Sequence, residues 1–271
     1  MELAICHYSL HRTFTARQWT LADLVGYVEG AGVTGIDFHV RFLGDVESAA
    51  DRILAALSES NLVLAGLSLS TNFNQDDPVE FRKQIETARD WLEVAGAIGA
   101  PVSRVFGGHL TDRSDPSVRG VGLERVIMAL KELAPVAADQ GVVLALENHG
   151  GLPCTGEEQC EVIEAVGSPH CRATIDVGNY LQCPQAPEAG VAEAARYCAY
   201  VHAKDFRRLA DGALEPTAVG RGDVDLLACL RLIVGAGYDG FIALEYEGLD
   251  DELSGVPQSV SYIVDVLQQL T

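Results

Sequence analysis

The chain has 271 residues, 48% of them hydrophobic and 21% charged, so it can bury the core of one large α/β domain or two small ones. Acidic residues outnumber basic ones 39 to 19. The resulting formal charge of -20 argues against a general affinity for nucleic acid, because phosphate binding needs a basic face. No apolar run approaches the roughly 18 residues of a membrane span.

The N-terminal stretch MELAICHYSL has an acid and no basic region ahead of its apolar residues, which is unlike a secretory signal. Seven cysteines are scattered without a CxxC pair. They suggest neither a disulfide framework nor a zinc knuckle, and we expect them to be small buried hydrophobic residues. The expected location is cytoplasmic, and neither a membrane nor a nucleic acid is an expected partner.

Short apolar runs alternate with longer segments of helical period along the chain, which is the pattern of a parallel sheet built from βα units. Eight runs are predicted strands: residues 3–8, 35–40, 62–69, 103–108, 142–147, 173–176, 200–205 and 241–246. Eight such units in somewhat more than 250 residues favour an α/β fold of the closed (β/α)8 TIM barrel type. A doubly wound sheet is the alternative, but the GxGxxG signature after the first strand is missing.

The helices predicted between the strands have recognisable starts and stops. Asp77-Pro78 opens a long helix that ends at Gly99. Three further helices are predicted over residues 117–140, 222–234 and 257–270. Because no Pro/Ser/Gly-rich linker divides the chain, residues 1–271 are predicted to form a single domain.

Polar residues gather at the predicted ends of the strands, where barrels of this type place their active sites. The stretch VVLALENHGG delivers Glu147, and three later strands deliver Asp176, His202 and Glu245. Side chains alternate along a strand, so Glu147, His202 and Glu245 would point at the barrel axis. Carboxylates this close would raise one another's pKa unless a cation lay among them. We therefore predict that these four residues bind one divalent metal ion.

Three carboxylates and one imidazole form an oxygen-rich ligand set. This set favours Mn²⁺, with Mg²⁺, Co²⁺ and Zn²⁺ as alternatives. Other polar residues near strand ends are candidates for the reaction itself. Lys204 lies two residues beyond His202 and faces the same way, where it would assist proton transfer or, alternatively, pair with Asp205 or Glu247. His149 is a second candidate for acid/base work.

Four residues are candidate substrate contacts: His7, His109, Asn179 and Arg207. A guanidinium such as that of Arg207 would bind a substrate carboxylate or phosphate. Aromatic residues near the ends of the first four strands are candidates to form pocket walls, because sugars present apolar CH faces. These aromatic residues are Tyr8, Phe14, Phe38, Phe42, Phe73 and Phe106.

Several short motifs occur in order on successive strands: SLST (68–71), RVFGG (104–108), LENHGG (146–151), TIDVGN (174–179), VHAKD (201–205), GRGDVD (220–225) and ALEYEG (243–248). Together they resemble the sugar phosphate isomerase/epimerase family of xylose isomerase-like TIM barrels, over essentially the whole chain. The resemblance implies that Glu147, Asp176, His202 and Glu245 are metal ligands. It also implies that the two glutamates act as acid and base on opposite sides of a bound polyol.

One residue departs from part of that family. Members that resemble ketose 3-epimerases carry a histidine three positions after the aspartate of the sixth strand, and this chain has Asn179 there. The departure removes a substrate contact or proton carrier. The resemblance therefore does not specify a ketose epimerase, and it does not specify a phosphorylated substrate.

The expected activity is that of a metal-dependent isomerase or epimerase of a sugar or related polyhydroxy carbonyl compound. A carboxylate would remove a proton beside the carbonyl, and the metal would stabilise the resulting enediolate. A lyase, such as a dehydratase or β-eliminase of a keto-sugar or keto-inositol, is the nearest alternative. The acidic charge disfavours phosphodiester hydrolysis, and the intact ligand set disfavours a noncatalytic binding protein. Such barrels often form homo-oligomers, but no sequence patch specifies one.

Overall fold

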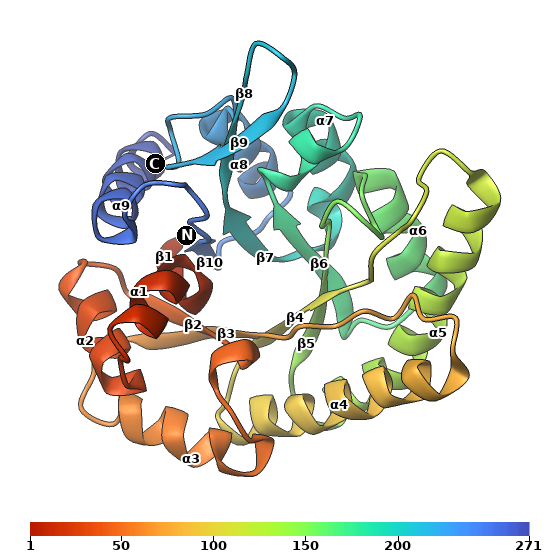
Figure 1. Cartoon of the computed structure of the whole chain (residues 1–271), viewed down its shortest axis with the longest axis horizontal. Coiled ribbons are helices and arrows are strands. Elements are labelled where there is room, and N and C mark those ends of the chain that lie inside the picture. Colours follow the sequence, from red (N-terminus) through yellow and green to blue (C-terminus); the bar gives the residue numbers. More distant parts are fainter. Residues whose placement is uncertain (271) are drawn as a thin grey trace.

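Eight parallel strands close into one barrel in the computed structural model, which describes residues 1–270. Figure 1 looks into the end of the barrel where the strands have their carboxyl termini. The fold is therefore the predicted (β/α)8 TIM barrel. The barrel strands are β1 (Glu2–Cys6), β2 (Gly35–His39), β3 (Val63–Ser68), β4 (Val102–Phe106), β5 (Val143–Glu147), β6 (Cys171–Asp176), β7 (Cys198–Ala203) and β10 (Phe241–Leu244).

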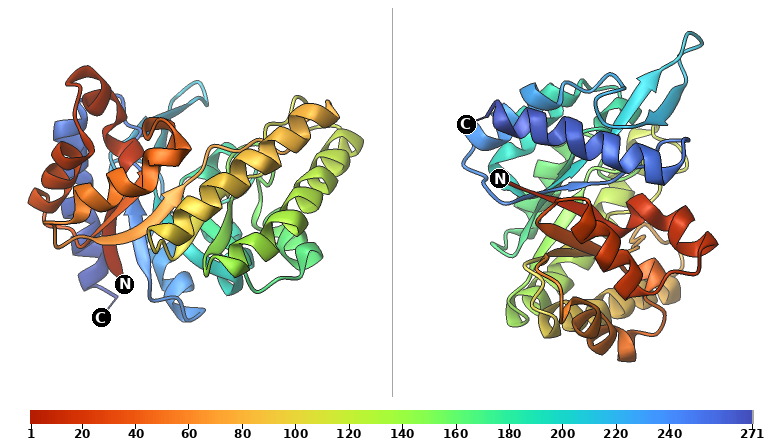
Figure 2. Two further views of the ribbon diagram at one scale, coloured as in Figure 1. Left: turned by 90° about the horizontal axis from the view of Figure 1, so that it is seen from below. Right: turned by 90° about the vertical axis from the view of Figure 1, so that its left-hand side faces the viewer.

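Each strand of the barrel pairs with its neighbours in the chain, and β1 pairs with β10 to close the ring. All eight predicted strands are present, and their ends differ from the predicted ends by no more than two residues. The seventh strand ends at Ala203, so residues 204 and 205 lie outside it. Asp205 instead begins a hairpin of β8 (Asp205–Arg208) and β9 (Leu214–Thr217), which the sequence did not predict. Figure 2 shows this hairpin projecting beyond the barrel strands.

Helices surround the barrel, and α4 and α5 lie side by side on one flank (Figure 2). The α-helices are α1 (His11–Ala16), α2 (Leu21–Gly30), α3 (Val46–Leu57), α4 (Pro78–Ala97), α5 (Pro116–Asp139), α6 (Gly156–Val166), α7 (Pro187–Ala194), α8 (Leu226–Gly235) and α9 (Glu252–Gln268). Short 3-10 helices are η1 (His7–Leu10), η2 (Val40–Phe42), η3 (Asn179–Gln182) and η4 (Ala195–Tyr197). The predicted start of α4 is confirmed, since the Asp77 carboxylate accepts a hydrogen bond from the backbone N–H of Val79 over 2.9 Å.

The helix predicted over 222–234 begins later, at Leu226. The residues before it turn around Asp205, whose carboxylate accepts hydrogen bonds from the backbone N–H groups of Gly220, Gly222 and Val224 over 2.9–3.1 Å. Gly222 is required there, because a Cβ atom would lie 2.2 Å from Oδ1 of Asp205. Asp225 then caps the helix by accepting a hydrogen bond from the backbone N–H of Ala228 over 2.9 Å, so α8 starts after the turn that Asp205 holds.

The last helix begins earlier than predicted, at Glu252 rather than Pro257. Asp251 caps it by accepting a hydrogen bond from the backbone N–H of Leu253 over 3.1 Å. Pro257 lies inside the helix, where its missing N–H costs one hydrogen bond. Packing of Val256 and Val260 against the core stabilises the helix across this position.

The inside of the barrel has an apolar floor below its polar mouth. Ala4, Ala65, Val102, Ala145, Tyr200 and Ala243 form this inner cluster. Because side chains alternate, the residue two positions after an inward-facing residue also faces inward. Ala145, Tyr200 and Ala243 are therefore followed toward the mouth by Glu147, His202 and Glu245. The floor keeps water away from the underside of these polar residues.

The cysteines only partly follow the expectation from sequence. Cys154 and Cys183 form a disulfide between the loop after β5 and the loop after β6, which contradicts the expectation of isolated cysteines. Their loops are adjacent only because β5 and β6 are neighbours in the barrel. The other cysteines, Cys6, Cys160, Cys171, Cys198 and Cys229, are free and buried. Among residues 1–270, no helix has both the length and the hydrophobicity to cross a lipid bilayer.

Candidate metal centre

Four buried side chains meet at the mouth of the barrel. Glu147 ends β5, Asp176 ends β6, His202 lies in β7 and Glu245 directly follows β10. One potential ligand atom from each lies within 4.8 Å of the others. The structure thus brings together the same four residues that the sequence placed on neighbouring strand ends.

Hydrogen bonds around the ligands hold the strand ends in place. Asn148 bonds with the backbone of Asp176 twice, donating to its carbonyl over 2.9 Å and accepting from its N–H over 3.0 Å. Oδ1 of Asp176 accepts hydrogen bonds from the N–H groups of Gly178 and Asn179, which leaves Oδ2 facing the cluster. Gly178 allows close approach, since a Cβ atom there would lie 2.6 Å from the carbonyl oxygen of Lys204.

The atoms that face one another lack hydrogen-bond partners. Buried atoms without a partner include Oε2 of Glu147, Oδ2 of Asp176, Nδ1 of His202 and Oε2 of Glu245. Leaving polar atoms unpaired in the interior costs about 1–3 kcal/mol each, and more for charged groups. Three carboxylate oxygens and one imidazole nitrogen are the donors that a divalent cation of intermediate hardness binds. The residues therefore fit a metal ion.

The electrostatics of the cluster also favour a cation. Burial raises the pKa of Glu147 to about 7, although Arg104 and His202 oppose the shift. Burial likewise raises the pKa of Asp176. For His202, burial would lower the pKa, but Glu245 and Glu147 outweigh it and raise the pKa to about 10. Without a metal ion, the cluster therefore retains protons that a cation would displace.

Lys204 is a buried cation beside the cluster. Its Nζ lies 2.6 Å from Oε2 of Glu245, 3.3 Å from Oδ2 of Asp176 and 3.4 Å from Oε1 of Glu247. Burial would lower the pKa of Lys204, but these carboxylates raise it well above its ordinary value. For Glu245, burial would raise the pKa. The charges of Lys204 and His202 outweigh burial and hold the pKa of Glu245 well below its usual range. The ammonium therefore remains charged. Of the two alternative partners that the sequence suggested, Glu247 pairs with it and Asp205 does not.

Arg104 on β4 is part of the site, and the sequence analysis did not identify it. Its Nε lies 3.0 Å from Oε2 of Glu147 and its Nη2 lies 3.6 Å from Oε1 of Glu245, as ion pairs without hydrogen-bond geometry. Nη1 donates to the carbonyl of Leu69 over 2.9 Å. An arginine within an otherwise apolar strand was the signal available in the sequence, because charged residues are almost never fully buried without partners.

Asp37 on β2 was also missed, and it lies behind His202. Its Oδ2 accepts hydrogen bonds from Ser68 over 2.9 Å and Tyr200 over 3.0 Å, and lies 3.7 Å from Nε2 of His202. A carboxylate behind a histidine ligand orients the ring and selects the nitrogen that faces the metal. Here it leaves Nδ1 of His202 directed toward Glu147 and Glu245, at 3.6 and 3.7 Å.

Two other predicted residues lie next to the cluster. Asn179 is fully buried and donates a hydrogen bond from Nδ2 to Oε1 of Glu147 over 2.9 Å. The ring of His149 packs 4.2 Å from the ring of Phe106. Burial lowers the pKa of His149 to about 3, so its imidazole is neutral at physiological pH.

The remaining candidate substrate contacts lie elsewhere. His7 is fully buried among the rings of Phe14, Phe38 and Phe42, and burial lowers its pKa to about 3. His109 is exposed and borders a separate surface depression beside Asn74. Arg207 is exposed on the hairpin and pairs with Glu215.

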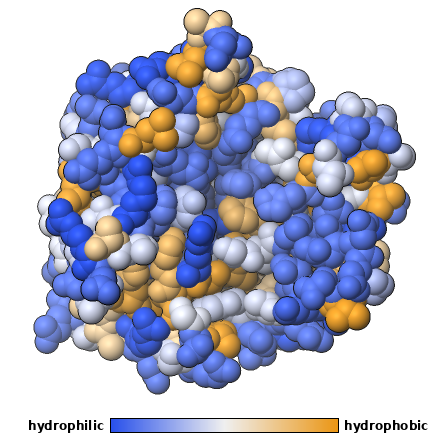
Figure 3. Space-filling model, in the orientation of Figure 1, coloured by the Kyte–Doolittle hydropathy of each residue, from blue (hydrophilic) through white to orange (hydrophobic). Residues whose placement is uncertain are grey.

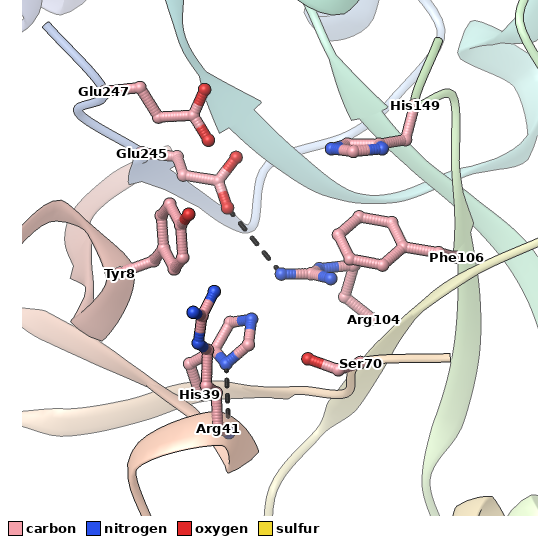
Figure 4. Close-up of a pocket in the computed structure, with 9 residues that line it drawn as sticks. All are labelled: Tyr8, His39, Arg41, Ser70, Arg104, Phe106, His149, Glu245 and Glu247. Carbon is pink, nitrogen blue, oxygen red and sulfur yellow. Dashed lines mark hydrogen bonds and ion pairs between the residues drawn. The ribbon is translucent and has the colours of Figure 1, made fainter. Parts of the chain in front are cut away.

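A cavity of about 130 Å³ opens beside the cluster. The barrel mouth around it is hollowed and largely hydrophilic (Figure 3). Figure 4 shows Glu245 and Glu247 on one side of the cavity and arginine, histidine and serine side chains across from them. The lining residues are Tyr8, His39, Arg41, Ser70, Arg104, Phe106, His149, Glu245 and Glu247. Of the predicted aromatic wall residues, Tyr8 and Phe106 are in this lining.

Carboxylates and a histidine gather at the carboxyl ends of the strands in this closed (β/α)8 barrel. Enzymes with this fold carry their active sites at that end. Comparison with known proteins specifies the family. The chain belongs to the xylose isomerase-like TIM barrel family, whose sequence model matches residues 25–266. This confirms the resemblance seen in the motifs.

Individual relatives are distant. An uncharacterised protein of Methanocaldococcus jannaschii is 26% identical over 173 residues, which span 62% of this chain and 58% of that protein. A xylose isomerase-like TIM barrel protein from Mycobacterium smegmatis, solved in complex with magnesium, has a TM-score of 0.73 and 23% identity over 92% of this chain and 89% of its own. An L-ribulose 3-epimerase has a TM-score of 0.78 and 17% identity over 99% of this chain and 95% of its own. Sugar 3-epimerases are thus among the structural neighbours.

Proposed function

We propose that the protein is a divalent-metal-dependent isomerase or epimerase of a small polyhydroxy carbonyl compound. The observation that supports this most strongly is the convergence of buried ligand atoms without hydrogen-bond partners from Glu147, Asp176, His202 and Glu245. These four residues would hold the ion. When bound, the ion supplies Lewis acidity, which polarises a carbonyl and stabilises negative charge on oxygen.

The two glutamates are the proposed proton carriers. Glu245 lines the cavity, and Oε2 of Glu147 lies 3.0 Å from Nε of Arg104, which also lines it. A substrate between them would present the hydrogen beside its carbonyl to one carboxylate, and the other would return a proton from the opposite side.

Lys204 and His149 are proposed to assist. The Lys204 ammonium lies 2.6 Å from Glu245 and stabilises its carboxylate form, which is the form able to accept a proton. His149 is neutral and lines the cavity, so one ring nitrogen donates a hydrogen bond to a substrate hydroxyl and the other accepts one. The structural neighbours include an L-ribulose 3-epimerase and a protein in complex with magnesium, and both support the same class of chemistry.

Metal content is the first test. Protein dialysed against Mn²⁺ should retain about one ion per chain, and Glu147→Gln or Glu245→Gln should weaken binding at least tenfold. Glu161→Gln provides the control, because Glu161 is an exposed carboxylate on α6. Equal Mn²⁺ affinity in the three variants would overturn the proposal.

The reaction is tested separately with ketoses, keto-inositols and 3-keto-glycosides in D₂O, followed by NMR. An isomerase or epimerase incorporates deuterium at one carbon and leaves the substrate formula otherwise unchanged. A lyase on the same fold releases water or another leaving group. Binding of Mn²⁺ without deuterium incorporation or elimination for any substrate would contradict proton transfer as the activity on these classes of compound.

A further inference from the structure

The cavity has two chemically different sides. Glu245 and Glu247 lie on one side, next to the metal cluster, and Arg41 and Arg104 lie on the other (Figure 4). We propose that the arginine side binds a carboxylate group of the substrate, so that the substrate is a small hydroxy- or keto-acid rather than a neutral sugar. This inference rests on the proposed function and specifies its substrate class.

Arg104 supplies the first observation. It is 1% exposed and reaches the cavity from inside the barrel, with its guanidinium directed into the space (Figure 4). Nη1 is satisfied by the carbonyl of Leu69, but Nε and Nη2 have no hydrogen-bond partner. The nearby glutamates compensate the charge without forming hydrogen bonds. Buried donors left unpaired are costly, and an anionic oxygen entering the cavity would satisfy them.

Contacts with neighbouring groups hold the Arg104 guanidinium in place. The ring of Phe106 lies 3.9 Å from its central carbon, and the ring of His149 packs on Phe106. A guanidinium fixed between a carbonyl and an aromatic face loses little further freedom when it binds a ligand. The stack therefore presents a preorganised donor edge to the cavity.

Arg41 supplies a second, independent observation. It follows β2 on η2, is exposed, and lines the same cavity. Within residues 1–270 its guanidinium forms neither an ion pair nor a hydrogen bond, and its central carbon lies 6.0 Å from the centre of the Phe42 ring. Figure 4 shows its side chain pointing into the cavity beside His39. Burial and the charge of Arg104 hold the pKa of His39 well below its usual value, so this neighbour adds a neutral donor or acceptor.

The shape and size of the cavity favour a small carboxylate. A planar carboxylate matches the flat, forked donors of arginine. Phosphate sites in enzymes commonly use backbone N–H groups of a glycine-rich loop or a helix N-terminus, and no glycine is among the residues that line this cavity. The volume of about 130 Å³ is below the range of roughly 300–1,000 Å³ for drug-sized ligands. A short acid would place its carboxylate at the arginines and its carbonyl and hydroxyl groups at the cluster.

Three probes with one carbon skeleton test the proposal: glycerate, glycerol and glycerol 3-phosphate. Their affinities are measured by isothermal titration calorimetry with Mn²⁺-loaded and with metal-free protein. Glycerate should bind at least about tenfold more tightly than glycerol, and Arg41→Gln should weaken glycerate about tenfold while leaving glycerol unchanged. Arg41→Lys keeps the positive charge but loses the forked pair of donors. Its affinity for glycerate should lie between those of the unmodified protein and Arg41→Gln.

Arg231→Gln is the matched control, since Arg231 is an exposed arginine on α8 away from the cavity. Arg104→Gln should also weaken glycerate, and its Mn²⁺ content is measured in the same samples because Arg104 contacts two candidate ligands. The proposal is overturned if glycerate binds no more tightly than glycerol, if Arg231→Gln weakens it as much as Arg41→Gln, or if glycerol 3-phosphate binds more tightly than glycerate. Failure to bind Mn²⁺ overturns the metal-dependent function instead, and the metal-free titrations still decide the carboxylate question.

Discussion

The side chain of Asn179 donates a hydrogen bond to Oε1 of Glu147 over 2.9 Å, and both residues are fully buried. This contact holds one carboxylate oxygen of Glu147 and leaves Oε2 directed at the cluster. Oδ1 of Asn179 in turn accepts a hydrogen bond from Gln182, which fixes the amide orientation. Asn179 therefore sets the direction in which a candidate metal ligand and base points.

Removing that contact should weaken metal binding. We expect Asn179→Ala to lower Mn²⁺ affinity about tenfold, the lower end of the effects seen when the partner of a metal ligand is lost. Gln182→Ala loses only the hydrogen bond between Gln182 and Asn179. It should change Mn²⁺ affinity less than threefold, which corresponds to about half a kcal/mol of binding free energy. Competition with a chelator measures both. An equal effect of the two substitutions would show that Asn179 does not orient Glu147.

Metal binding should release protons. In the metal-free protein, burial raises the pKa of Glu147 to about 7, and Glu245 and Glu147 overcome burial to raise the pKa of His202 to about 10. At pH 7, His202 therefore carries a proton and Glu147 carries about half of one. Ligands bind metals in their deprotonated forms, so roughly one to two protons leave per ion and affinity falls as the pH is lowered from 8 to 6.

Calorimetric titration of Mn²⁺ in two buffers of different ionisation enthalpy counts the released protons. His109→Ala should release as many as the unmodified protein, because His109 is exposed and lies outside the cluster. His202→Ala should release at least about one fewer. Equal heats in the two buffers would rule out the proposed protonation of the metal-free cluster.

The disulfide should stabilise the fold. Cys154 and Cys183 are 29 residues apart in the sequence, and closing a loop of that size is worth about 3–4 kcal/mol in the chain-entropy model. We expect Cys154→Ser with Cys183→Ser to lower the free energy of unfolding by about that amount. Denaturant titration with and without a reductant measures it. Reductant should destabilise the unmodified protein and leave the double variant unchanged, and no response in either would argue that the thiols are not paired.

Asp205 should be needed for stability rather than for chemistry. Its carboxylate accepts hydrogen bonds from three backbone N–H groups in the turn before α8. Asp205→Ala leaves these donors unpaired, and we expect a loss of about 3 kcal/mol in the free energy of unfolding. Asp211→Ala is the control, since the exposed Asp211 accepts one backbone hydrogen bond, from Ala213, and should cost less than about 1 kcal/mol. Comparable losses of unfolding free energy in the two variants would contradict the structural role of Asp205.

Much of the site could be predicted because strand geometry is local. The period of two along a strand placed Ala145 and Glu147, or Tyr200 and His202, on one face before any contact was known. The order of strands in a parallel barrel follows the order of the chain, so polar residues at successive strand ends are neighbours in space. These two regularities are sufficient to bring together the four candidate ligands.

Other features depend on contacts that periodicity does not encode. Asp205 begins the hairpin after β7 and holds the turn before α8 through three backbone groups that lie 15 to 19 residues away, and α8 starts only after its cap at Asp225. Likewise, the early start of α9 depends on a cap at Asp251 and on packing that tolerates Pro257. Side-chain acceptors and tertiary packing overrode the turn and proline signals in both places.

The sequence by itself determined the barrel, the strand ends and the set of residues that would surround a metal ion, because each follows from the alternation and order of short apolar runs. Only the tertiary structure decided that Arg104 reaches both Glu147 and Glu245, that Asn179 orients Glu147, and that Cys154 meets Cys183. Those relationships join side chains from different strands and loops. Their distances are set by closure of the barrel and by the conformations of long side chains, neither of which is visible in the pattern along the chain.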